Sequence, residues 1–304
     1  MTATSATIEA RATRLDTRAL AALLLCCALW GLNQVAIKAA LPEVPALVQL
    51  AIRSVVALAL VLGWMRWRGI AWNWRDGTLA PGLLAGLLFA VEFGCIFVGL
   101  QYTTAARSVV FINTSPFVVA LMLAWLVPAE RLRPLQTFGL VLAFAGVAYA
   151  FAEPAPQTGA WPWLGDTLIV IAAVLWGLTT VVIRFSALRH APAEKTLAYQ
   201  LLVAGLLSPL AAWAAGSPWP AAWSTLALGS LFYQAVIVTF ASYLLWFWLL
   251  TRYPATRVQA FVFLTPVFGT AFAGWLLGEQ LGGELLSALV AVAIGLSLLN
   301  RRSA

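Results

Sequence analysis

One acidic residue, Glu92, lies deep inside a long apolar run of this sequence, within "FAVEFGC". Such a run is long enough to cross a bilayer, and an ionisable group at that depth usually faces a cavity or a partner. One interpretation is a carboxylate that binds an ammonium group or carries a proton. The alternative is a neutral carboxyl group hydrogen-bonded to a neighbouring helix. Arg53 and Lys38 are possible charge partners, although each could instead extend its charge to the outer membrane surface, which we favour for Lys38.

A second group of polar side chains follows a tryptophan in the stretch "ALWGLNQVAIKAAL", residues 28–41. Asn33 and Gln34 come three and four residues after Trp30, so the three side chains share one face of a helix. They could place an aromatic ring beside amide donors and acceptors in a central cavity. They could equally hold the helix to its neighbours through hydrogen bonds, as such residues often do in membranes.

The stretch "VLWGLTTVVIRFSAL", residues 174–188, repeats this pattern with Trp176, but Thr179 and Thr180 replace the two amides. Threonine in a helix can bond to its own backbone, which makes a purely structural role more plausible here. An apolar pocket rich in aromatic rings with a few polar anchors is typical of small-ligand sites, although any one ring could simply be packing. Further candidates for such a pocket are Asn113, Tyr199, Gln200, Tyr233, Tyr243, Trp246 and Gln259.

The composition indicates an integral membrane protein. Hydrophobic residues make up 62% of the 304 residues and charged residues 10%, with a mean hydropathy of +0.92. A soluble domain has about 25% charged residues. The net charge of +7 does not indicate nucleic-acid binding, because the basic residues sit in short loops between apolar runs.

Cysteine and histidine offer no metal or disulfide pattern. Cys26, Cys27 and Cys95 all lie in apolar runs without CxxC spacing, and the one histidine, His190, is in a loop beside Arg189. We therefore expect no metal site and no cofactor.

Ten apolar runs are each long enough for a membrane-spanning helix of about 20 residues. They do not alternate between apolar and polar residues as barrel strands do. If the N-terminus is cytoplasmic, all of the 18 Lys and Arg residues except Lys38, Arg53 and Arg107 fall on the cytoplasmic side, as the positive-inside rule requires. Both termini are then cytoplasmic. The expected spans are 19–40, 46–65, 79–100, 106–127, 134–152, 163–186, 197–215, 224–249, 256–277 and 283–300.

The sequence of the first five spans recurs in the last five. Residues 105–132 match 255–281, with Arg107 paired with Arg257 and Pro116 with Pro266 at an offset of 150. Because five is odd, the second copy enters the membrane from the opposite side, which makes an inverted repeat with the substrate site near mid-membrane. We expect each proline to break a backbone hydrogen bond midway along its helix. The two bends could be static kinks or a matched pair of hinges on which gates flex.

These spans divide the chain into five parts. Residues 1–18 form a cytoplasmic tail, 19–152 the first repeat, 153–162 an extracytoplasmic linker, 163–300 the second repeat and 301–304 a second cytoplasmic tail. One membrane domain thus accounts for almost the whole chain.

Three features together resemble the EamA type of the drug/metabolite transporter superfamily. They are "LWG" in the first and sixth spans, a proline in the fourth and ninth, and Glu-x-Leu after each of those, at Glu130 and Glu279. The resemblance covers residues 19–300, most closely to bacterial inner-membrane exporters of amino acids, including aromatic ones. It implies efflux of small metabolites from the cytoplasm by alternating access.

An exporter of drugs or other metabolites stays open as an alternative, and so do two other classes, a passive facilitator or channel and a membrane enzyme. The sequence has no HExxH and no GxSxG and only one acid deep in a span, whereas catalysis needs acid and base groups within reach of each other. The absence of GxxxxGK[ST] excludes an ATP-driven pump within this chain. We expect a small-molecule substrate, amino acids above all, and the lipid bilayer as partners, and no nucleic acid. Proton coupling is open, and nothing requires more than a monomer.

Overall fold

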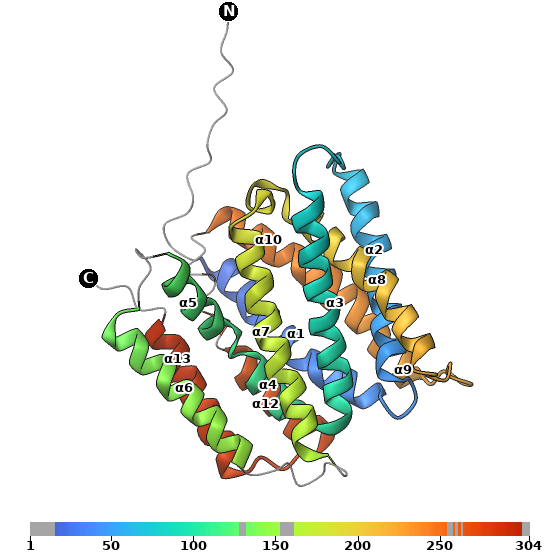
Figure 1. The fold of residues 1–304 in the computed structure, drawn as a ribbon. Helices are drawn as coiled ribbons and strands as arrows, with labels where there is room; N and C mark the ends of the chain where they lie inside the picture. The colour runs from blue at the N-terminus through green and yellow to red at the C-terminus, as the bar shows by residue number, and fades with distance from the viewer. Residues whose placement is uncertain are drawn as a thin grey trace, which may run out of the picture.

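The computed structural model describes residues 16–127, 132–152, 161–253, 258, 261–262 and 264–299. The predicted tails and linker, and the candidate Gln259, lie largely or wholly outside these residues. Within them the chain is helical, without strands (Figure 1). The elements are α1 Thr17–Ala40, α2 Ala46–Trp67, α3 Leu79–Tyr102, α4 Ala105–Ile112, α5 Ser115–Leu126, α6 Pro134–Ala152, α7 Pro162–Arg184, η2 Ala187–His190, α8 Ala193–Ala214, α9 Thr225–Phe232, η3 Tyr233–Ser242, α10 Tyr243–Arg252, α12 Leu264–Leu277 and α13 Gly283–Leu299.

Among the described residues, eight helical stretches are long and apolar enough to cross a membrane. The stretches predicted as the ninth and tenth spans contain the shorter apolar helices α12 and α13, of 14 and 17 residues. The all-helical membrane class is therefore confirmed, while the count of ten spans stays a prediction.

The fourth predicted span is not one helix. α4 ends at Ile112, and α5 begins at Ser115 after the turn at Asn113 and Thr114. Pro116 is the second residue of α5 and Pro266 the third of α12, so the expectation that both interrupt a helix midway is wrong. Proline is tolerated in a first turn because its missing N–H would have no intrahelical partner there.

The eighth predicted span contains an unpredicted π-helical segment, η3, which runs from Tyr233 to Ser242 between α9 and α10. Within it the Thr239 hydroxyl donates a hydrogen bond to the Gln234 carbonyl, five residues earlier, at 2.8 Å. Such segments are rare and often occur at functional sites.

Small residues let several helices approach closely. A Cβ atom on Gly82 or Gly86 of α3 would lie 2.5 Å from the Tyr199 ring or 2.6 Å from Val203 of α8. α6 and α13 lie side by side (Figure 1), and a Cβ on Gly139 would meet the Gly295 backbone at 3.0 Å. Without a hydrophobic force between helices in lipid, such close contact supplies the packing.

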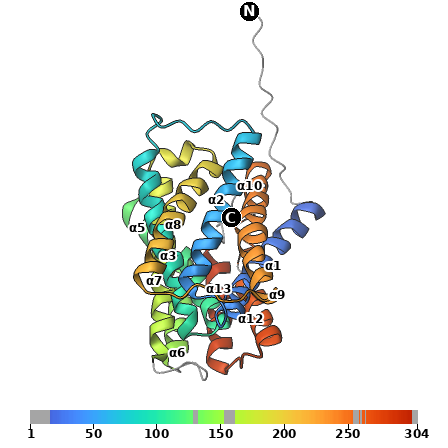
Figure 2. The same cartoon turned by 90° about the vertical axis from the view of Figure 1, so that its right-hand side faces the viewer.

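The longer helices run between two opposite ends of the bundle (Figures 1 and 2). α1 crosses it obliquely and lies against α12 (Figure 2). α1, α3, α6 and α8 begin at one end, which we call the base-rich end because most of the described basic residues lie at or near it. These residues are Arg18, Arg66, Arg68, Arg75, Arg133, Arg184, Arg189, Lys195 and Arg252. The opposite, acid-rich end has Glu43, Asp166, Glu279 and Glu284, together with Lys38 and Arg107.

Candidate functional site

A cavity of about 1120 Å³ lies between the helices. It extends to the base-rich end, where Leu132, Arg133 and Leu299 line it, and no described charged residue of the acid-rich end is part of its wall. This volume is at the upper limit of ordinary small-ligand pockets. The predicted site residues in its wall are Trp30, Asn33, Gln34, Arg53, Glu92, Asn113, Pro116, Trp176, Thr179, Thr180, Gln200, Tyr243 and Trp246.

Several buried polar atoms on this wall have no hydrogen-bond partner in the described part of the chain. They include the amide oxygens of Asn33 and Gln34, Oε2 of Glu92, and Nη1 of Arg53. An unsatisfied buried group costs about 1–3 kcal/mol, and more when charged. The cavity therefore offers free acceptors and a free donor to a ligand or to water.

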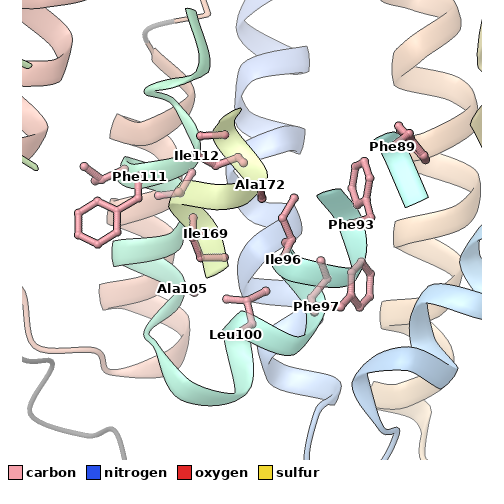
Figure 3. Packing of buried hydrophobic residues seen from close by; sticks show 14 of the residues in the cluster. Phe89, Phe93, Ile96, Phe97, Leu100, Ala105, Phe111, Ile112, Ile169 and Ala172 are labelled. Atoms are coloured by element: carbon pink, nitrogen blue, oxygen red, sulfur yellow. The ribbon is translucent and has the colours of Figure 1, made fainter. Parts of the chain in front are cut away.

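Arg53 of α2 is held in place without an acidic partner among the described residues. Its Nε donates to Thr239 Oγ1 in η3 at 2.7 Å, and its guanidinium carbon lies 4.0 Å from the centre of the Phe93 ring. Phe93 packs in turn on Phe89, along the line of rings that α3 presents in Figure 3. Arg53 and Glu92 are close enough to interact electrostatically but form no direct ion pair.

Three aromatic side chains form one side of the cavity. The Trp30 ring centre lies 5.0 Å from that of Trp246 and 6.1 Å from that of Tyr243. The indole N–H of Trp30 donates to Ser242 Oγ at 2.8 Å, and this hydroxyl donates to the Val238 carbonyl. The polar edge of Trp30 is thus satisfied while its ring stays available at the cavity.

The second copy of the tryptophan motif is satisfied internally. Thr179 donates to the Leu175 carbonyl at 2.9 Å and Thr180 to that of Trp176 at 3.0 Å, each one helical turn back. Asn113 likewise donates to the Val109 carbonyl at 2.7 Å. Thr179 and Thr180 thus line the cavity with their single hydroxyl donor already used, and Asn113 uses one of its two amide N–H groups.

Four of the predicted residues lie elsewhere, and Pro266 is one of them, in the first turn of α12. Lys38 donates to the carbonyls of Leu100 and Thr103 at the end of α3, so it neither pairs with Glu92 nor simply extends to the surface. A cation satisfies the free carbonyls at a helix C-terminus. Tyr233 donates to the Leu29 carbonyl, away from the cavity wall.

Tyr199 belongs to a polar cluster near the base-rich end. Its hydroxyl lies 3.2 Å from that of Thr78, and its ring packs on Trp72. Beside it, the buried Lys195 donates to Asp76 at 2.6 Å. This hydrogen bond, with a smaller contribution from Thr78, lowers the pKa of Asp76 to about 2. Tyr199 therefore stabilises the α2–α3 loop and does not line the cavity.

Other wall residues were not predicted. Arg133 and Gln136 line the cavity near the base-rich end, and Thr265 lines it from α12. Arg133 directly precedes the predicted span 134–152, and nothing in the sequence distinguishes it from the other loop arginines. The role of Thr239 in holding Arg53 depends on η3, which apolar periodicity does not predict.

The acid-rich end is closed by buried polar contacts. Both Glu279 carboxylate oxygens accept hydrogen bonds from the N-terminus of α4, from the Ala105 and Ala106 amides at 2.7 and 2.9 Å. Arg107 forms an ion pair with Asp166 of α7, and its Nε donates to that carboxylate at 2.9 Å. Together with Lys38, these residues connect α1, α3, α4, α7 and the end of α12.

The EamA-like transporter family matches this chain over residues 17–152 and 163–301. The chain belongs to that family. Among similar proteins, a "probable amino-acid metabolite efflux pump" of Salmonella typhimurium is 28% identical, over 90% of this chain and 91% of its own length. An "uncharacterized transporter" of Archaeoglobus fulgidus is 26% identical, over 83% and 86% of the two chains.

The fold also occurs in a solved crystal structure, with a TM-score of 0.63 and 19% identity over 94% of this chain and 98% of the other. As a member of the EamA-like family, the protein is a transporter with a helical membrane fold. The names of its relatives indicate transport rather than enzymatic activity.

Proposed function

We propose that this protein exports amino acids, with a preference for apolar and aromatic ones, across the bacterial inner membrane by alternating access. The observation that carries the proposal is the single-sided cavity. It extends to the base-rich end, ends short of the acid-rich end, and is lined by seven aromatic residues and by unpaired polar atoms. Two relatives, from Salmonella typhimurium and Escherichia coli, bear the name of probable amino-acid metabolite efflux pumps.

The base-rich end is the cytoplasmic side in this proposal. Basic residues accumulate in cytoplasmic loops, and the described ends of α1 and α13, Thr17 and Leu299, both belong to that end. The cavity is then open to the cytoplasm and ready to take up its substrate.

An inverted repeat is supported by contacts that occur in equivalent pairs. At an offset of 149, Gly139 corresponds to Ala288 and Gly146 to Gly295. If the halves are related by a two-fold axis, the contact between Gly139 and Gly295 has an equivalent between Ala288 and Gly146. Both contacts occur in the structure. The two segments matched by the family coincide with the two proposed halves.

The first and sixth spans show the same equivalence. A Cβ on Gly31 would meet Gly269 and Thr265 of α12, and a Cβ on Gly177 would meet Val118 and Val119 of α5. Residues 265 and 269 correspond to 115 and 119 at the offset of 150. Each tryptophan-glycine motif thus packs on the helix that begins with the repeated proline.

Alternating access requires the acid-rich end to open. In the proposed cycle the contacts of Glu279 with α4, and of Arg107 with Asp166, break when the cavity opens outward. Such polar contacts suit a gate because they have discrete formed and broken arrangements. Pro116 and Pro266 stay hinge candidates, now at the start of α5 and α12.

Reconstitution tests the proposal. Purified protein in liposomes is given labelled amino acids and other metabolites, with and without a pH gradient. Saturable uptake with counterflow of an amino acid is expected from a carrier. Linear, non-saturable flux would indicate a channel, and transport of other metabolites alone would contradict the amino-acid assignment.

A further inference from the structure

We infer that the cavity contains a head-group subsite that binds the carboxylate of its substrate through Arg53 and the ammonium group through Glu92, Asn33 and Gln34. The protein would then select molecules that carry both charges. This inference rests on the proposed function and specifies which amino acid derivatives the cavity accepts.

The first argument is the burial of unpaired charge. Arg53 is 2% exposed and Glu92 is 4% exposed. Nη1 of Arg53 and Oε2 of Glu92 have no hydrogen-bond partner in the described ranges, and both side chains line the cavity. A buried polar group without a hydrogen-bond partner is destabilising, so a ligand that supplies the missing hydrogen bonds to both side chains is bound favourably.

The second argument is that Arg53 and Glu92 do not neutralise each other. They share the cavity, but no ion pair joins them within the described residues. Arg53 is fixed by Thr239 at its Nε and by the Phe93 ring at one face. These contacts leave the Nη1 end of the guanidinium free, and guanidinium binds carboxylate with strong, directional hydrogen bonds.

The third argument concerns the neutral acceptors. Asn33 and Gln34 are 6% and 7% exposed, and each has an unpartnered side-chain oxygen on the cavity wall. An ammonium group has three donors and no acceptor. Glu92, Asn33 and Gln34 together offer three acceptors of the kind that such a group requires.

The fourth argument is that this set is specific to one half of the chain. At offsets of 146 to 150, the counterparts of Asn33, Gln34 and Glu92 are Thr179, Thr180 and Ser242. All three hydroxyls are bonded to their own backbone. The repeat alone therefore does not explain the charged set, which points to a role in recognising the ligand.

The test compares three compounds with one apolar group. They are phenylalanine, phenethylamine, which lacks the carboxylate, and 3-phenylpropionate, which lacks the ammonium group. The same comparison is made with leucine, 3-methylbutylamine and 4-methylpentanoate. Each is assayed for competition with labelled amino acid in liposomes and for thermal stabilisation of the purified full-length protein.

We expect each single-charge analogue to compete at least about 10-fold more weakly than its amino acid, because a hydrogen bond to a charged group is lost. Arg53→Gln should weaken phenylalanine about 10- to 100-fold and abolish its advantage over phenethylamine. Arg53→Lys should restore part of that advantage. Val56→Ala changes an exposed residue of the same helix and serves as the control for the effects of expression, purification and reconstitution.

If amino acids exchange but the amines compete equally well, the subsite is wrong and amino acid export stands. If amino acids stabilise the protein selectively without being exchanged, the subsite stands and the proposed export fails. If no amino acid either exchanges or stabilises the protein, both are overturned. The wild-type comparisons decide these outcomes even if an Arg53 variant does not fold.

Discussion

α1 and α7 both carry the tryptophan-glycine motif, but the polar side chains that follow it differ in their hydrogen bonding. After Trp30, the amides of Asn33 and Gln34 leave their oxygens unpartnered within the described structure. After Trp176, both threonine hydroxyls are bonded to the preceding turn of their own helix. The duplicated pattern preserves how the helices pack, whereas the side chains available to a ligand belong to the first copy.

The same contrast continues in the neighbouring helices. Glu92 lies in the regular helix α3, whereas its counterpart Ser242 ends the π-helical η3 and accepts the Trp30 indole N–H. No equivalent bond joins Trp176 and Glu92 in the part of the chain described. The second half thus positions Trp30 and, through Thr239, Arg53, while the first half supplies the charge.

The largest expected effect concerns the two motif glycines. A Cβ on Gly31 would lie 2.6 Å from the Gly269 backbone nitrogen, whereas a Cβ on Gly177 would meet a side-chain methyl of Val118 at 2.9 Å. Gly31→Ala should therefore destabilise the protein by about 3 kcal/mol or prevent folding, and Gly177→Ala by about 1 kcal/mol. Yield and thermal unfolding of the detergent-solubilised protein measure this. Equal losses of stability would mean that the backbone at Gly31 adjusts to a Cβ atom as easily as the Val118 side chain does at Gly177.

A second prediction concerns the acid that only the first half has. If Glu92 carries a proton during transport, Glu92→Gln should flatten the pH dependence of transport. It should also weaken substrate binding about 10-fold or more through loss of a charged acceptor. Initial rates measured between about pH 5 and 8, a range that brackets physiological pH, give both results. An unchanged pH profile in an active variant would disprove proton carriage by this residue.

The polar pairs after each tryptophan give a direct comparison of the halves. Asn33→Ala with Gln34→Ala should raise the half-saturation concentration at least about 10-fold, because two hydrogen bonds from the substrate ammonium group to amide oxygens are lost. Thr179→Val with Thr180→Val should change it less than about 3-fold, since those hydroxyls bond to their own backbone. Concentration series in liposomes measure both. Similar effects of the two double variants would show that the halves contribute alike.

The two tryptophans should differ in the same direction. Trp30 contacts Trp246 and Tyr243, so Trp30→Ala should weaken aromatic substrates about 5-fold more than small ones, a stacking contribution of about 1 kcal/mol. Trp176→Ala should show a smaller difference. Competition by phenylalanine and alanine measures it, and an equal loss for both substrates would point to packing alone.

The smallest expected effect lies outside the cavity. Because the pKa of Asp76 is lowered to about 2 by its hydrogen bond from Lys195, its contribution to stability is complete above the ordinary carboxyl range. It is lost as the pH falls toward 2. Asp76→Asn should lower the midpoint of thermal unfolding at pH 7 by a few degrees. The difference from wild type should shrink between about pH 4 and 2, and a difference independent of pH would contradict the assignment.

The sequence predicted this site unevenly. Trp30, Asn33, Gln34 and Glu92 were identified because polar or amphipathic groups inside apolar runs are costly unless they face a cavity or partner. Lys38 and Tyr199 met the same criterion but are satisfied by the α3 carbonyls and by Thr78. Composition alone does not distinguish a residue that faces a cavity from one that faces a polar neighbour.

By itself the sequence determined the membrane class and the helical stretches, and it predicted the pairing of residues between the two halves. These follow from hydropathy, span length and repetition, which are properties of neighbouring residues along the chain. Only the tertiary structure decided that α4 and α5 are separate helices, that η3 positions Thr239 beside Arg53, and that Glu279 closes the far end of the cavity. These depend on which helix faces converge, and contacts between residues more than a hundred positions apart fix that arrangement.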